Sequence, residues 1–165
     1  MKKVILVSVF LIISFLLSAQ NFVISNLKKH VIESEEFIYH FKVLLDDSNT
    51  KLDNTTYYYW FKDGKIHKNQ GGYSGSLLNG IYSIYSKQGA LLEEGNYEIG
   101  RKEGKWKKWN TSGKLIELSN WKHGKLHGVL YQYTDDEVIK KRYKHGLSKK
   151  QISPKLEKKK ANEEA

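Results

Sequence analysis

The 165-residue chain contains no cysteine, and this absence excludes several kinds of structure. It removes disulfide bonds, thiolate metal sites and the lipid-modified cysteine of a lipoprotein. A long apolar run is missing as well. The longest run, residues 4–17, has 14 residues, whereas a membrane-spanning helix needs about 20.

That short apolar run has the layout of a secretory signal peptide. Lys2 and Lys3 precede it, and Ala19 offers a small residue at the point where cleavage would leave Gln20 first. We therefore expect residues 1–19 to be a signal peptide, with an uncleaved N-terminal anchor as the alternative. The predicted location is outside the cytoplasm: periplasmic, associated with the outer membrane, or secreted.

The chain has a formal net charge of +10, and the excess of positive charge lies in its C-terminal part. Residues 101–165 contain eighteen Lys and Arg against eight Asp and Glu, while residues 61–100 balance at four and four. Such a basic segment attracts nucleic acid, anionic lipid or acidic polysaccharide. Export argues against nucleic acid, and a lysine-rich solvated surface without a partner is the simpler interpretation.

Glycine and aromatic residues recur every 24 residues between residues 57 and 146. The recurring positions are Gly80, Gly104 and Gly128; Gly89 and Gly113; Gly100 and Gly124; Tyr73, Tyr97 and Trp121; and Tyr85, Trp109 and Tyr133. Gly64 and Tyr73 belong to a looser first copy, and Tyr143 and Gly146 end a shortened last copy. The spacing predicts about four copies of one structural unit.

Each unit has the pattern of a β-hairpin. Residues 105–109 are rich in aromatic side chains, which favour strands, and residues 110–113 end in a glycine suited to a tight turn. Residues 86–89 and 61–64 predict the same kind of turn. One hairpin is marginally stable in water, so the copies should stack. We therefore predict an all-β fold: an elongated single-layer antiparallel sheet of tandem hairpins.

The units resemble the MORN repeat, in the shorter bacterial variant found in proteins labelled YwqK-family antitoxins. The residues that carry the resemblance are 95–109, from Gly95 through Gly100 and Gly104 to Trp109, and 120–128, with Trp121, Gly124 and Gly128. The resemblance covers roughly residues 57–146. It implies a ladder of β-hairpins and a role in protein or membrane association. An antitoxin role would require a location inside the cell, which conflicts with the predicted export.

The flanking segments are less regular. Residues 20–56 are expected to form a strand or cap region, with a strand over 36–45, while residues 26–34 fit either a helix or a strand. Residues 147–165 are rich in lysine and poor in large apolar groups, which predicts a disordered or marginally helical tail.

No catalytic motif is present in the sequence. It contains neither a Gly-x-Ser-x-Gly elbow nor a His-Glu-x-x-His pair, and its glycines are explained as turn residues. His123 and His145 recur at one repeat position with His127 nearby, so a metal site is conceivable, but repeated exposed turn residues explain them as well. We therefore predict a protein that is not an enzyme and that needs neither cofactor nor metal.

The aromatic and lysine residues of the clearest unit are the candidate binding residues. Trp106 and Trp109 are three residues apart, so a regular strand would point them to opposite faces. One set should form the stripe that the hairpins share, and the other should lie exposed among lysines, where it could stack on sugars or lie at a lipid interface. The alternative is that both faces are half-buried. The candidate residues are Trp106, Lys107, Lys108, Trp109, Trp121 and Lys122.

These observations predict a non-catalytic binding or scaffold module of the cell envelope. The first expectation is an unidentified protein partner. The alternative is that the basic aromatic surface binds anionic lipid or polysaccharide.

Overall fold

The computed structural model describes residues 26–48 and 50–152. Their strands are β1 (Leu27–Glu33), β2 (Phe37–Leu44), β3 (Tyr57–Lys62), β4 (Lys65–Gln70), β5 (Ser76–Leu77), β6 (Gly80–Ser86), β7 (Leu91–Glu98), β8 (Arg101–Trp109), β9 (Leu115–Lys122), β10 (Lys125–Leu126), β11 (Gly128–Tyr133), β12 (Val138–Lys144) and β13 (Leu147–Ile152). The described residues contain no helix, which confirms the predicted all-β class.

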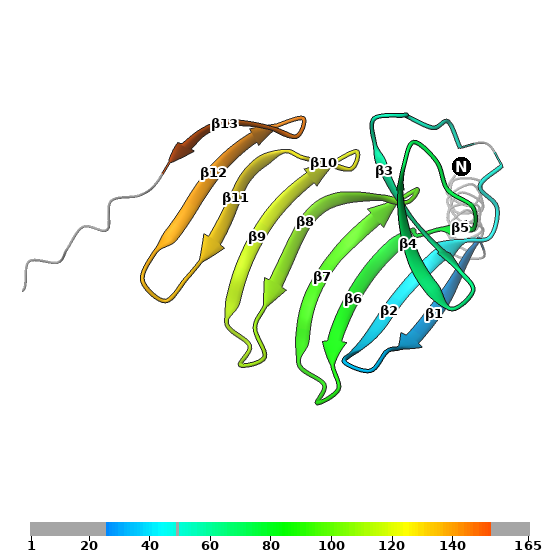
Figure 1. The fold of residues 1–165 in the computed structure, drawn as a ribbon, viewed down its shortest axis with the longest axis horizontal. Coiled ribbons are helices and arrows are strands. Elements are labelled where there is room, and N and C mark those ends of the chain that lie inside the picture. Colours follow the sequence, from blue (N-terminus) through cyan, green and yellow to red (C-terminus); the bar gives the residue numbers. More distant parts are fainter. Residues whose placement is uncertain (1–25, 49, 153–165) are drawn as a thin grey trace, which may run out of the picture.

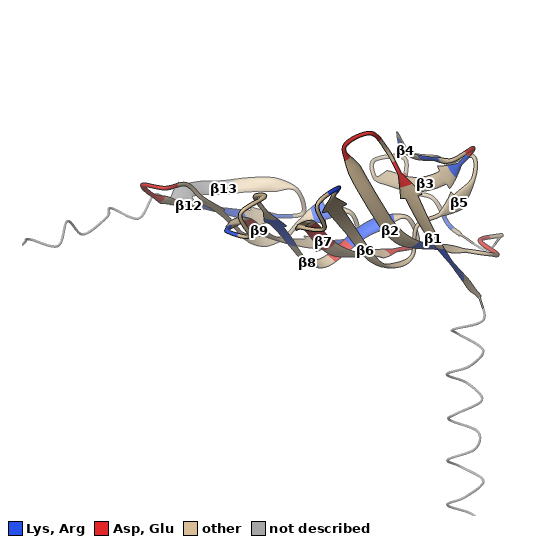
Figure 2. Ribbon diagram, turned by 90° about the horizontal axis from the view of Figure 1, so that it is seen from below, with Lys and Arg blue, Asp and Glu red and all other residues tan. Residues whose placement is uncertain are grey.

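Most strands form one ten-stranded antiparallel sheet in the order β1-β2-β6-β7-β8-β9-β11-β12-β13, with β10 paired to β9 (Figure 1). From β6 onward the strands follow the chain order, as expected for hairpin after hairpin. The prediction of a single layer is wrong at one end. Strands β3, β4 and β5 form a separate sheet, which lies on one side of the large sheet at its β1–β2 end (Figure 2).

The aromatic side chains of β3 are packed in two separate clusters. Tyr58, Trp60 and Leu77 form one buried cluster within this second sheet, and Tyr59 and Phe61 pack against the large sheet. The large buried rings on the other side of that interface are those of Phe41, Tyr82, Tyr97 and Trp106. The core is therefore concentrated where two layers overlap.

Two-residue turns recur at four places in the structure. The turn residues are Asp63-Gly64, Ile99-Gly100, His123-Gly124 and His145-Gly146, and all eight have positive φ angles between 48° and 86°. Two consecutive positive φ values define the type I′ hairpin turn, whose twist matches that of the flanking strands. The Gly64 turn therefore belongs to this class, and the expectation that it resembles the turns at Gly89 and Gly113 is wrong.

The turns at Gly89 and Gly113 are longer. In each, the glycine N–H donates to a carbonyl three residues earlier, on Ser86 and Asn110 respectively, at 3.0 Å. In the last unit no glycine is available, and the Thr134 hydroxyl accepts from the backbone N–H of Glu137 at 3.0 Å. The side chains of Ser86 and Asn110 likewise accept backbone N–H groups in the two turns that contain glycine.

A bulge in β8 brings Trp106 into the core. Glu94 pairs with Lys107 and Asn96 with Glu103, so three residues of β8 lie opposite Gly95 alone. The Trp106 indole covers Gly95 so closely that a Cβ on that residue would lie 2.1 Å from its Cδ2. Trp106 is 1% exposed. Gly95 and Trp106 thus form one packing unit across two strands.

The flanks differ from expectation at the C-terminal side. Residues 26–34, which fitted helix or strand, form β1, and the strand expected over 36–45 is β2. Residues 147–152, assigned to a disordered or marginally helical tail, form β13 and pair with β12. Their backbone N–H and C=O groups pair with the edge of β12 and so add one more strand to the large sheet. The predicted signal peptide and the rest of the tail lie outside the described residues, among which no helix could cross a bilayer.

Candidate binding surface

The large sheet has two unlike faces. We call the face under β3–β5 the covered face and the opposite one the bare face. In an antiparallel ladder, directly paired residues share a face, and neighbours along a strand alternate. Trp106 pairs with Ser119, and both are buried on the covered face. Lys107, Leu118, Tyr131 and Lys140 are successive partners in register and therefore lie on the bare face.

Two rows of positive charge cross the bare face. Lys107 on β8 and Lys140 on β12 belong to one row, with Leu118 and Tyr131 between them. A second row contains Lys105 and Arg142, each two residues away from the first row along its own strand. Neighbouring strands lie about 4.8 Å apart, so each row spans roughly 14 Å, and the rows are roughly 7 Å apart.

Aromatic rings lie beside these cations. The Tyr131 and Tyr133 rings are nearly parallel, with an angle of 11° between planes and 6.3 Å between centroids. The Lys140 Nζ lies 5.5 Å from the centre of the Tyr131 ring. Trp109 follows Lys107 by two residues and is half-buried, lining a shallow hollow of about 460 Å³ with Leu91 and Gly113. All three rings are therefore partly exposed beside the cations.

We call this set the cation–aromatic surface. Its members are Lys105, Lys107, Trp109, Tyr131, Tyr133, Lys140 and Arg142. It begins at β8, because Glu94 of β7 is the direct partner of Lys107 and supplies a negative charge on that side.

The structure divides the predicted binding residues between the two faces. Lys107, Trp109 and Lys122 lie on the bare face by strand alternation, whereas Lys108 and Trp121 lie on the covered side. Trp106 is buried, so its assignment to an exposed binding set is wrong: the β8 bulge and Gly95 draw it into the core. Tyr131, Lys140 and Arg142, which the sequence did not single out, complete the surface. The alternation of side chains along the two strands of the last unit is the sequence pattern that could have identified them.

A buried ion pair was also not predicted. The Lys102 Nζ lies 3.1 Å from Glu93 Oε1 and 3.7 Å from the centre of the Trp106 ring. Burial lowers the pKa of Lys102, while Glu93 opposes that shift. Both side chains are about 15% exposed, so this pair belongs to the core of the covered face and is not available to a large partner.

The histidines do not converge on one site. The ring centroids of His127 and His145 are 5.2 Å apart. His123 instead lies near Glu98 and Glu103, and the possible metal-ligating atoms of these three residues lie within 4.8 Å of one another. Glu103 also accepts from the His123 backbone N–H at 2.7 Å. These three side chains are the described residues that could hold a metal cation. They lie near the turn ends of the central strands β7, β8 and β9, and the hydrogen bond between His123 and Glu103 already explains why two of them are close together.

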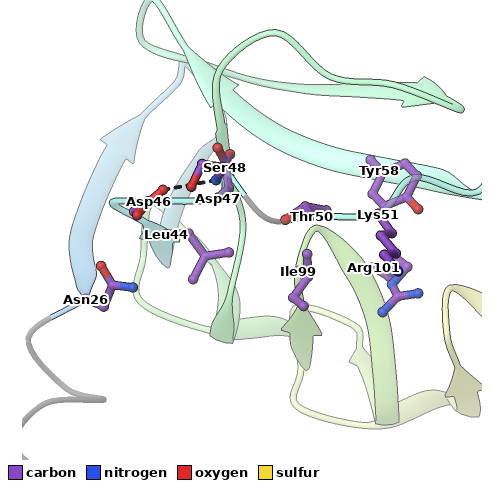
Figure 3. A pocket seen from close by; sticks show the side chains of 10 residues that line it. All are labelled: Asn26, Leu44, Asp46, Asp47, Ser48, Thr50, Lys51, Tyr58, Ile99 and Arg101. Atoms are coloured by element: carbon purple, nitrogen blue, oxygen red, sulfur yellow. Dashed lines mark hydrogen bonds between the residues drawn. The ribbon is translucent and has the colours of Figure 1, made fainter.

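A hollow of about 540 Å³ opens between the β2–β3 connection and the start of β8 (Figure 3). Asp46, Asp47 and Lys51 line it from the connection, and Tyr58, Ile99 and Arg101 from the strands and turns. The Asp46 carboxylate accepts from the Ser48 N–H at 3.0 Å, and this bond lowers its pKa. Opposite charges line the same hollow, so it shows no preference for one ligand charge.

Comparison with protein families, with curated proteins and with solved structures finds no match to this chain.

Proposed function

We propose that this protein is an exported, non-catalytic binding module and that the cation–aromatic surface is where it binds a partner. One observation carries the proposal. The bare face of β8–β12 combines two rows of cations with flat aromatic rings, and no second layer covers it in the part of the chain that the structure describes. The resemblance to MORN repeats and the signal-peptide pattern support the same class of function.

The charge of this surface favours an anionic partner. Lys105, Lys107, Lys140 and Arg142 lie on one face, and the acidic Glu117 of the intervening strand points to the other. Complementary charge increases the rate of encounter and selects among partners. We therefore propose a partner in the cell envelope whose surface is negatively charged.

Two matched double variants test the proposal. Lys107→Ala/Lys140→Ala removes two cations from the bare face, and Lys108→Ala/Lys141→Ala removes two from the same strands on the opposite face. Both variants change the net charge equally. Envelope components retained by the immobilised protein should be lost with the first variant and kept with the second, as quantified by gel and mass spectrometry.

Circular dichroism spectra that match the wild type would show that both variants fold. Equal recovery of every component by the two folded variants would remove the bare face as the binding surface.

A further inference from the structure

The cation–aromatic surface has the geometry to follow a chain of repeated charge, and we infer that its ligand is a linear acidic polysaccharide. This inference rests on the proposed binding function and specifies the partner. Three features of the surface argue for a sugar polymer rather than a bilayer or a folded protein.

The first feature is the arrangement of the cations in parallel rows. Lys107 and Lys140 are about 14 Å apart across three strand spacings, and Lys105 and Arg142 repeat this spacing one step along the strands. A polymer of uronic acid sugars carries one carboxylate at each ring along an extended chain. Such a chain can pair with both ends of a row at once, and pairing at several points raises its affinity.

The second feature is the coupling of charge to an aromatic platform. Tyr131 lies within the Lys107–Lys140 row, and the Lys140 ammonium lies 5.5 Å from its ring centre. A sugar that stacks its C–H face on Tyr131 would place a carboxylate within reach of Lys140. Tyr133 provides a nearly parallel ring 6.3 Å further along the strand.

The third feature is the acidic hairpin tip beside the surface. Asp135, Asp136 and Glu137 lie there, and their charge would repel any anionic ligand that covered them. A bilayer is a broad plane and would have to cover this tip together with the rows of cations. A single polymer chain can follow the rows without passing over the tip.

Binding to polygalacturonate, measured by calorimetry on the purified protein, tests the inference against two other probes. Dextran is the neutral polymer, and vesicles of phosphatidylglycerol and phosphatidylcholine are the lipid surface. We expect binding to polygalacturonate at low ionic strength, no binding to dextran, and no binding to the vesicles. Raising salt from about 0.02 M to about 0.5 M should abolish binding, because screening then acts within the spacing of the rows.

Variants separate specific pairing from general attraction. Lys107→Ala/Lys140→Ala should weaken polygalacturonate binding roughly tenfold, whereas Lys108→Ala/Lys141→Ala should change it less than about twofold. Tyr131→Leu should weaken binding, because it keeps an apolar side chain but loses the flat ring. Tyr131→Phe keeps the ring and should weaken binding less than Tyr131→Leu does.

Each other outcome has a definite meaning. Equal loss in the two lysine double variants would show general attraction to a basic protein and overturn the inference. Binding to vesicles but not to polygalacturonate would overturn it in favour of lipid. If neither probe binds, yet envelope components are still lost with Lys107→Ala/Lys140→Ala, the polysaccharide inference is overturned and the proposed binding function survives. If no component depends on these lysines, the proposed function itself fails.

Discussion

At the scale of single residues, the tightest requirement lies at Gly95. A Cβ there would lie 2.1 Å from the Trp106 ring, a separation that neither the ring nor the strand can accept without moving. We expect Gly95→Ala to destabilise the protein by about 3 kcal/mol, at the upper end of overpacking costs. Denaturant unfolding monitored by tryptophan fluorescence measures this loss.

Gly89→Ala is the matched control for steric contact, since a Cβ there meets nothing within 4 Å. Its positive φ should still cost about 1 kcal/mol. An equal loss from both substitutions would mean that backbone strain, and not contact with Trp106, decides the effect.

Asp53 is a second residue for which the structure predicts a measurable effect, a dependence of stability on pH. Hydrogen bonds from Thr55 and Thr56, with a smaller contribution from the charge of Lys125, lower its pKa to about 2. A carboxylate with a depressed pKa stabilises the folded state above its unfolded value near 4, and this contribution is lost as pH falls through about 2. The stability difference between wild type and Asp53→Asn should therefore be largest above pH 4 and disappear near pH 2.

Urea unfolding at a series of pH values between about 2 and 6 measures that difference. A difference that stays constant across this range would show that Asp53 acts through packing or turn geometry and not through its charge.

At the scale of elements, the Ile99-Gly100 turn joins the two sheets. The Tyr59 N–H donates to the Gly100 carbonyl, and the Gly100 N–H donates to the Leu78 carbonyl, both at 2.7 Å. Ile99 has a φ of 48°, an unfavourable angle for a β-branched residue. Its half-buried side chain packs against the cluster of Tyr58, Trp60 and Leu77, which offsets that strain.

We predict that Gly100→Ala loosens the second sheet. The added Cβ would lie 2.6 Å from Leu77 Cδ2 and 3.1 Å from the Tyr59 carbonyl oxygen. A loss of about 2 to 3 kcal/mol is expected, with faster hydrogen exchange at the amides of Tyr59 and Leu78. Exchange in β11 and β12 should stay unchanged, and equal acceleration across the whole chain would argue against a local effect.

Elements also show where sequence reasoning succeeded and where it failed. The 24-residue spacing located the hairpins from β6 to β12, because turn glycines and strand aromatics are local requirements that every copy repeats. It did not reveal that β3 and β4 leave the large sheet, because Tyr59 and Trp60 occupy aromatic positions like those of the other copies. Lys102 was missed for a related reason: its burial depends on Glu93 and Trp106, contributed by separate strands.

At the scale of the whole molecule, the core is unevenly distributed. The fully buried large side chains belong to β2, β3, β5, β8 and the residue after β5, whereas Leu130, at 8% exposed, is the buried apolar residue of β11. Two layers protect the β1–β8 end, and the β9–β13 end is one layer thick (Figure 2). Stability in such repeat structures depends on contacts between neighbours.

We therefore expect hydrogen-exchange protection to fall along the sheet from β8 to β12. Opening free energies should decrease with distance from the second sheet, because each later hairpin has fewer buried contacts. Native-state exchange measured by mass spectrometry, strand by strand, gives this profile. A uniform value across β6–β12 would instead indicate a single cooperative unit.

The order of the strands has a consequence for how such a protein can change over time. From β6 onward each hairpin is added beside the previous one, and the second sheet contacts the other end. Duplication of one 24-residue unit would lengthen the ladder without disturbing the two-layered end. It would also add two strands to each row of cations. The number of repeats, and not the shape of any pocket, would then determine how long a stretch of polymer the protein can hold.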